Sequence, residues 1–173
     1  IDSRGGLLSN VKSDWNSTFK ELEQYVDDDA LDSSKTNAQS AVLVAHLNGK
    51  DVLLPGDAVP CKLSEALNFY RRGGIAHFDL VKLPHHGSYK NITQDILCKI
   101  ECSDYVVSTD GTKFRHPNKK MMMKVIKWGK KTGDSMLTFH LNYYDHLIKE
   151  MNISESDCKS YRFECDGKRA FEF

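Results

Sequence analysis

From residue 41 to residue 141, short apolar runs alternate with segments that carry apolar residues at helical spacing. Strands that alternate with helices in this way predict a layered α/β fold. The expected strands are residues 41–47, 52–54, 78–83, 105–108 and 136–141. Helices are expected over 62–72, from Asn91 to Ile100, from Pro117 to Trp128, and over 143–151.

Local signals mark where several of these elements begin and end. Asn48-Gly49 lies between two apolar runs and predicts a β-hairpin, because a type I′ turn needs positive φ at both central residues. Asp166-Gly167 lies between two alternating runs, 161–165 and 169–173, and predicts a second hairpin. Asn91 is expected to be an N-cap, and Pro117 to be the first residue of its helix.

The chain divides into three parts on this interpretation. Residues 1–35 are expected to form an amphipathic helix over 10–26, with Val11, Trp15, Phe19, Leu22 and Val26 on its apolar face, and an acidic loop that leads into the domain. The polar stretch 32–39 is expected to be exposed and mobile. Residues 36–141 carry the alternating pattern, and residues 142–173 are expected to form a helix and the terminal hairpin.

Composition excludes some classes of protein. The 173 residues include 24 Lys plus Arg and 24 Asp plus Glu, so the net charge is zero and a uniformly basic nucleic-acid binder is not expected. Apolar runs stay far below the roughly 18 residues of a membrane span. The five cysteines match no disulfide framework or zinc knuckle, which predicts reduced thiols in a cytoplasmic protein.

Five residues with metal-binding or acid–base chemistry follow directly after predicted strands: Asp57, His85, His86, Asp110 and His116. In layered α/β folds, ligand sites collect at the carboxyl ends of strands, so these side chains are expected to converge. Imidazole and carboxylate are ligands of zinc, and also of iron and manganese.

Four motifs in this order resemble the carboxyl half of a metallo-β-lactamase-fold hydrolase, closest to the ComEC-like branch. They are LLPGD at residues 53–57, LVKLPHHGS at 80–88, STDG at 108–111, and His116-Pro117, preceded by SAVL at 40–43. The resemblance covers roughly residues 36–130. It implies one half of an αββα sandwich with a zinc centre, two ions when the site is complete, with manganese or iron as alternatives.

The resemblance also implies roles for individual residues. Asp57 matches the aspartate that bridges two metals, and either His85 or His86 matches the last ligand histidine. His116 matches a histidine that contacts the substrate or leaving group. Gly87 and Ser88 would allow close backbone approach and offer a hydroxyl to the substrate.

One family motif is absent from this sequence. These hydrolases carry His-x-His-x-Asp-His in their amino half, and none of the seven histidines here has that spacing. Because a catalytic zinc needs about three protein ligands, this chain is expected to supply only part of a site. The other ligands would come from a missing amino-terminal half or a partner chain; alternatively, the chain is a degenerate relative kept for binding.

Between Gly111 and Gly133 there are eight basic residues and no acidic ones: Lys113, Arg115, Lys119, Lys120, Lys124, Lys127, Lys130 and Lys131. Lys113, Arg115, Lys119 and Lys120 are expected to contact phosphates, which favours a phosphodiester or nucleic acid as substrate. The alternatives are a solvated helix face, a non-catalytic module that holds nucleic acid or a partner chain, and hydrolysis of esters, lactams or thioesters.

Overall fold

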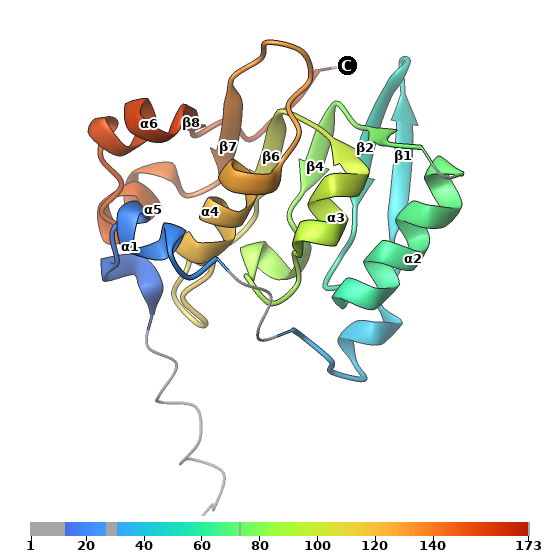
Figure 1. Ribbon diagram of the computed structural model, residues 1–173, viewed down its shortest axis with the longest axis horizontal. Coiled ribbons are helices and arrows are strands. Elements are labelled where there is room, and N and C mark those ends of the chain that lie inside the picture. The colour runs from blue at the N-terminus through green and yellow to red at the C-terminus, as the bar shows by residue number, and fades with distance from the viewer. Residues whose placement is uncertain (1–12, 27–30, 73, 173) are drawn as a thin grey trace, which may run out of the picture.

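The computed structural model describes residues 13–26, 31–72 and 74–172, and its centre is a six-stranded sheet (Figure 1). In spatial order the strands are β1 (Leu43–Leu47), β2 (Lys50–Leu54), β4 (Leu80–Lys82), β6 (Asp104–Val107), β7 (Leu137–Leu141) and β8 (Phe163–Asp166). β1 is antiparallel to β2, and every other neighbouring pair is parallel. A small parallel pair joins β3 (Ala76–His77) to β5 (Ile100–Glu101). The mixed α/β class is therefore confirmed.

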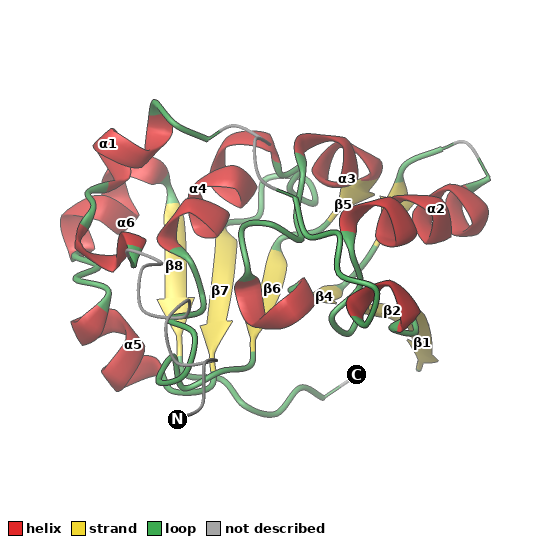
Figure 2. Cartoon of the chain, turned by 90° about the horizontal axis from the view of Figure 1, so that it is seen from below, coloured by secondary structure: helices red, strands yellow, loops and turns green. Residues whose placement is uncertain are grey.

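Helices α2, α3 and α4 lie along one face of this sheet (Figure 2). The α-helices are α1 (Phe19–Glu23), α2 (Pro60–Arg71), α3 (Gln94–Lys99), α4 (Lys119–Trp128), α5 (Tyr144–Glu150) and α6 (Glu155–Tyr161). Three 3-10 turns are η1 (Asp14–Asn16), η2 (Asn37–Gln39) and η3 (Pro84–Gly87). None of the helices in the described ranges is long and apolar enough to cross a bilayer.

The core lies between the sheet and these helices. Val81 pairs with Tyr105, and Tyr105 pairs with Phe139, so their side chains form one apolar row on the helix-covered face. All three are buried, as are Leu63 of α2 and Ile96 of α3. Because strand side chains alternate between faces, this row fixes which residues of β2, β4, β6 and β7 point away from the helices.

On the opposite face, the segment after β8 runs back across the sheet (Figure 2). The Phe171 ring packs edge-on against His140, with 5.0 Å between ring centroids. His140 is itself held between Asp166 and Asp104, with ring nitrogens 2.7 Å and 2.9 Å from their carboxylates. At the sheet edge, Leu43 and Leu47 of β1 remain exposed on this face.

Several expected elements are confirmed. The first hairpin turns at Asn48 and Gly49, which have φ of 49° and 79°. The strands expected at 52–54, 105–108 and 136–141 correspond to β2, β6 and β7. The helices expected over 62–72 and 143–151 correspond to α2 and α5.

Helix boundaries differ from the prediction at three places. The expected helix over 10–26 is divided into η1 and α1 within its described part, although Trp15, Phe19, Leu22 and Val26 are buried as expected; Val11 lies outside the described residues. α3 is capped by Thr93 and not by Asn91, whose side chain bonds elsewhere. α4 begins at Lys119 and not at Pro117, and Asn118 takes the N-cap position.

The prediction of a hairpin at the carboxyl end of the chain is wrong. Residues 161–165 fall into the end of α6 and into β8, which pairs in parallel with β7, and residues 167–172 form no strand. The 32–39 loop also differs from the expectation, since it contains η2 and places Asp32 and Asn37 against the candidate site.

Candidate active site at the strand ends

The carboxyl ends of four strands are joined by hydrogen bonds between the loops that follow them. After β2, the Gly56 carbonyl accepts a bond of 3.0 Å from the backbone N–H of His85, which follows β4. After β6, the Ser108 carbonyl lies 2.7 Å from Nδ1 of His86. Asn142, after β7, accepts a bond of 3.0 Å from the Thr109 N–H. The convergence expected at this edge of the sheet is therefore present.

The turn that carries the two histidines has an unusual backbone. His85, His86 and Gly87 have φ of 45°, 57° and 86°, so three consecutive residues lie in the left-handed region. Only Gly adopts this region without cost, and such strain concentrates at functional sites. At Gly87, a Cβ would lie 2.8 Å from Cβ of Pro117, so this position requires glycine for space as well.

His86 is oriented as metal-binding histidines usually are. A carbonyl oxygen only accepts, so Nδ1 of His86 carries the proton that bonds the Ser108 carbonyl. In the neutral ring, the lone pair is then on Nε2, which lies 3.9 Å from Oδ1 of Asp57. Metal-bound imidazole typically donates its other N–H to a carbonyl or carboxylate in this manner.

His85 faces a different set of partners. Its Nδ1 is 3.3 Å from Oδ1 of Asn91, 3.3 Å from Nδ2 of Asn37 and 3.5 Å from the Asp32 carboxylate. Asn91 is fully buried and also donates to Asp32 and to the Ala58 carbonyl. Of the two adjacent histidines, His86 therefore has the closer relation to Asp57, while His85 is tied to this polar cluster.

Asp32 is the anionic centre of that cluster. Although burial alone raises its pKa, hydrogen bonds from Asn37, Ser34 and Asn91 outweigh this effect and lower the pKa to about 2. The carboxylate is thus ionised at neutral pH and orients His85. Asp32, Asn37 and Asn91 were not predicted as site residues, because no motif or periodicity sets them apart from an ordinary polar loop.

His116 completes the group of imidazoles. Its ring centroid is 5.5 Å from that of His85, and both rings contribute to the same cavity. Burial, with smaller contributions from His85 and His86, lowers the pKa of His116 to about 4. At neutral pH it is therefore uncharged, so it can exchange hydrogen bonds with a substrate but cannot supply a full positive charge.

Two cavities meet at these residues. One, of about 450 Å³, contains Asp57, His86 and Asp110, and the other, of about 420 Å³, contains Asp32, Asn91 and Lys90. Four residues belong to both walls: His85, Lys113, Phe114 and His116. The two cavities are therefore neighbouring parts of one depression, and Phe114 is an exposed residue of their shared wall. The Asp110 carboxylate accepts hydrogen bonds from the backbone N–H and the hydroxyl of Thr112. These bonds lower the pKa of Asp110 and hold the loop after β6 in place.

The basic residues fall into two groups. Lys113 and Arg115 line the depression, and their contact with phosphate stays a prediction. Lys119 does not: it is 2% exposed, and its ammonium donates to the carbonyls of Trp15 and Ser17. This position contradicts the substrate contact expected of Lys119, because the ammonium is bound within the core.

Lys120 and Ser88, the other two residues expected to contact the substrate, differ in their relation to the depression: Ser88 lines it and Lys120 does not. Lys120 is half-buried, with its ammonium 5.2 Å from the centroid of the Tyr89 ring. Ser88 is 4% exposed, and its hydroxyl accepts a bond from the Lys90 N–H. Ser88 lines the second cavity, but this bond indicates that it stabilises the turn.

Two groups at this site could bind a metal ion together: the carboxylate of Asp57 and Nε2 of His86. Within residues 13–26, 31–72 and 74–172, no group of three or more His, Cys, Asp or Glu side chains is close enough to hold a metal ion. The donor set thus fits one side of a metal centre and not a full coordination shell. No family model, curated protein or solved structure matches this chain.

Proposed function

We propose that this chain supplies one part of the active site of a metal-dependent hydrolase of the metallo-β-lactamase superfamily. Asp57 and His86 would be its metal ligands, and the remaining ligands would come from an amino-terminal half or a partner chain. The proposal is carried by one observation: the Nδ1 proton of His86 is bound to a carbonyl, which leaves Nε2 directed toward Asp57 at 3.9 Å. Zinc fits this imidazole–carboxylate set, with manganese and iron as alternatives.

The edge of the sheet is consistent with half of a sandwich. Leu43 and Leu47 project from the face opposite the helices and are 58% and 49% exposed. Exposed apolar side chains on a sheet face are typical of a surface that packs against a second layer. An αββα arrangement would place that second sheet here.

For the substrate we propose a phosphodiester, including nucleic acid. Lys113, Arg115 and Lys90 line the second cavity beside the Asp57–His86 pair and could bind phosphate oxygens there. Phe114 lines both cavities and is 56% exposed, so it offers a stacking surface for a base. His116, uncharged at neutral pH, would hydrogen-bond the substrate or the leaving group.

A divalent metal in such a site acts as a Lewis acid that neutralises phosphoryl charge and activates water. This chain would contribute the remaining steps of positioning. Asp32 and Asn91 orient His85, Ser108 orients His86, and the left-handed turn directs the two rings to these different partners. The free thiols of all five cysteines favour the cytoplasm as the proposed location.

Zinc titration followed by imidazole nitrogen NMR would test the ligand assignment. We expect the Nε2 resonance of His86 to shift, and the shift to be lost in Asp57→Ala. His46→Ala is the matched control, because His46 contacts Asp51 in a separate exposed pair. Zinc that perturbs only the His46 pair, or leaves His86 unchanged at millimolar concentration, would contradict the assignment.

Hydrolysis of bis(p-nitrophenyl) phosphate with added zinc or manganese would test the reaction class. The assay requires the chain together with the amino-terminal half or partner chain. Activity is expected to fall by about 10²-fold or more in His86→Ala, because a lost ligand removes the metal's charge stabilisation. Activity that persists unchanged in Asp57→Ala and His86→Ala would rule out this site as the catalytic centre.

A further inference from the structure

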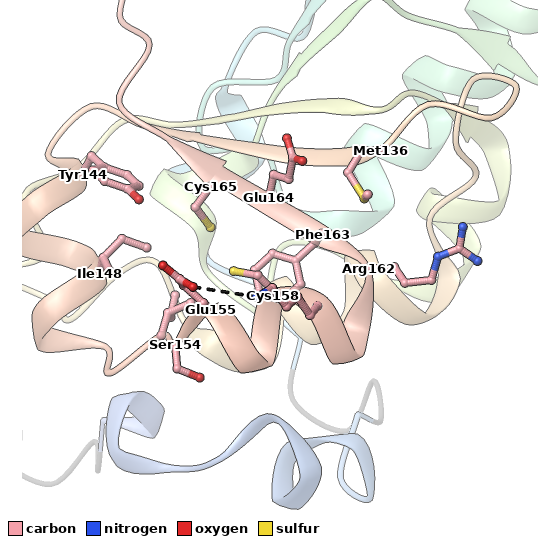
Figure 3. Close-up of a pocket in the computed structure, with 12 residues that line it drawn as sticks. Met136, Tyr144, Ile148, Ser154, Glu155, Cys158, Arg162, Phe163, Glu164 and Cys165 are labelled. Atoms are coloured by element: carbon pink, nitrogen blue, oxygen red, sulfur yellow. Dashed lines mark ion pairs between the residues drawn. The ribbon is translucent and has the colours of Figure 1, made fainter.

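A further cavity lies away from the strand ends, between α5, α6 and β8 (Figure 3). Its volume is about 580 Å³, and apolar side chains form most of its wall: Met136, Tyr144, Ile148, Ile153 and Phe163. Two of the five cysteines, Cys158 of α6 and Cys165 of β8, line it as well. Neither residue takes part in the candidate active site.

The two thiols face one another across the junction of α6 and β8 (Figure 3). The two thiols line the same cavity, and each shifts the pKa of the other. A disulfide requires the two sulfur atoms to come within about 2.0 Å of each other, and side chains that face one another on adjacent elements are placed to do so. Both side chains are partly exposed, so a small reactant can reach them through the cavity.

We propose that Cys158 and Cys165 form a redox-active dithiol that closes to an intramolecular disulfide by exchange with a low-molecular-weight disulfide. The thiolate of Cys158 attacks one sulfur of the small disulfide, whose S–S bond breaks and releases one small thiolate. Cys165 then loses its proton to solvent and attacks Sγ of Cys158, which releases the second small thiolate. Each released thiolate takes up a proton. Two protein thiols are oxidised, and one small disulfide is reduced to two thiols.

The surroundings assign different roles to the two sulfurs. Interaction with the Cys165 thiol lowers the pKa of Cys158, which favours its thiolate. The same interaction, together with burial, raises the pKa of Cys165 well above its usual range, so Cys165 stays protonated until its partner has reacted. Asp157, Glu164 and Asp166 oppose ionisation, while Lys159 and Arg162 lie on the cavity wall. Cys158 is therefore the attacking thiol and Cys165 the resolving one.

The other cysteines provide the contrast. Cys61 and Cys98 are exposed, and each would form a separate adduct. Cys102 is buried, and burial raises its pKa to about 12, so it stays unreactive. A background with Cys61→Ser and Cys98→Ser therefore isolates the pair within the full chain.

The test is incubation of this background with oxidised glutathione, then alkylation and peptide mass spectrometry. We expect a Cys158–Cys165 disulfide with the loss of two hydrogens and little retained glutathione. Cys165→Ser should trap glutathione on Cys158, and Cys158→Ser should react at least about tenfold more slowly. The same peptide map on the unsubstituted chain keeps the test valid if a variant fails to fold. Recovery of Cys158 and Cys165 as reduced thiols, or as two separate glutathione adducts, would overturn the proposal.

Discussion

The indole N–H of Trp15 donates a hydrogen bond of 2.7 Å to the carbonyl oxygen of Pro117. The ring also packs over Gly111, where a Cβ would lie 2.5 Å from the indole. On the same ring, Cζ of Arg115 lies 4.9 Å from the ring centroid. A residue near the start of the described chain therefore holds the loop that carries His116. This contact joins the amino-terminal segment to the candidate site.

Replacing Trp15 with Phe should destabilise the fold by about 1–3 kcal/mol, because it leaves the buried Pro117 carbonyl without its donor. Urea unfolding gives the free energy of unfolding for both proteins. Tyr25→Phe is the control, since Tyr25 is 65% exposed and its change should stay within about 0.5 kcal/mol. Equal stabilities for the Trp15 and Tyr25 variants would show that the Pro117 bond contributes nothing.

Asp14 makes a second long-range contact, accepting a bond of 2.7 Å from the backbone N–H of Lys120 in the first turn of α4. Burial raises the pKa of Asp14 above its ordinary 3.8, although the bonds from Lys120 and Lys119 offset part of the effect. Between pH 3.8 and the raised pKa, the folded state binds more protons than the unfolded state, so stability falls as pH rises.

Asp14→Asn keeps an acceptor but removes this titration. We expect the free energy of unfolding of Asp14→Asn, relative to that of the parent chain, to increase as pH rises from 3.5 toward neutrality, by about 1.4 kcal/mol for each unit by which folding raises the pKa of Asp14. Denaturant unfolding at a series of pH values measures it. The exposed Asp145→Asn serves as control. A relative stability that falls with rising pH would have the wrong sign for a raised pKa.

Local sequence patterns were sufficient to predict most strands of the sheet, but not its edge strand β8. The Asn48-Gly49 turn and the apolar runs of β2, β6 and β7 depend on neighbouring residues, which a sequence displays directly. Asp166-Gly167 shows the same local signal, yet β8 pairs in parallel with β7. That pairing depends on packing across the sheet, which no short segment encodes.

The site divides in the same way. Asp57, His85, His86 and His116 could be predicted to converge, because residues that follow strands collect at one edge. Asp32, Asn37 and Asn91 could not, since their hydrogen bonds to one another and to His85 span long separations in sequence. The burial of Lys119 and Lys124 could not be predicted for a related reason. The backbone carbonyls that accept hydrogen bonds from these lysines lie far from α4 in the sequence.

Gly87→Ala should destabilise the fold by about 2–5 kcal/mol, from positive φ and from contact with Pro117. Gly49→Ala is a matched control: its φ of 79° resembles the 86° of Gly87, but no atom lies within 4 Å of a Cβ there. It should cost only about 1–2 kcal/mol. Thermal or urea unfolding compares the two. A Gly87 variant no less stable than the Gly49 variant would show that the turn tolerates a side chain.

Lys124 provides the sharpest test of which basic residues belong to the core. It is fully buried in α4, and its ammonium donates bonds of 3.0 Å to the carbonyls of Tyr89 and Ile92. Lys124→Met fills a similar volume but leaves both carbonyls unsatisfied, so we expect a loss of about 2–4 kcal/mol in the free energy of unfolding. Lys127→Met, on the exposed side of the same helix, should change it by less than about 0.5 kcal/mol.

The two lysine variants also separate structure from binding. If the basic block held nucleic acid through its whole length, Lys124→Met would weaken binding while the protein stayed folded. We expect the reverse, because an ammonium bound to two backbone carbonyls cannot also reach a phosphate. Circular dichroism under urea, alongside fluorescence anisotropy with a labelled oligonucleotide at two salt concentrations, measures both properties. Normal stability combined with weakened, salt-sensitive binding would place Lys124 in an interface and contradict its assignment to the core.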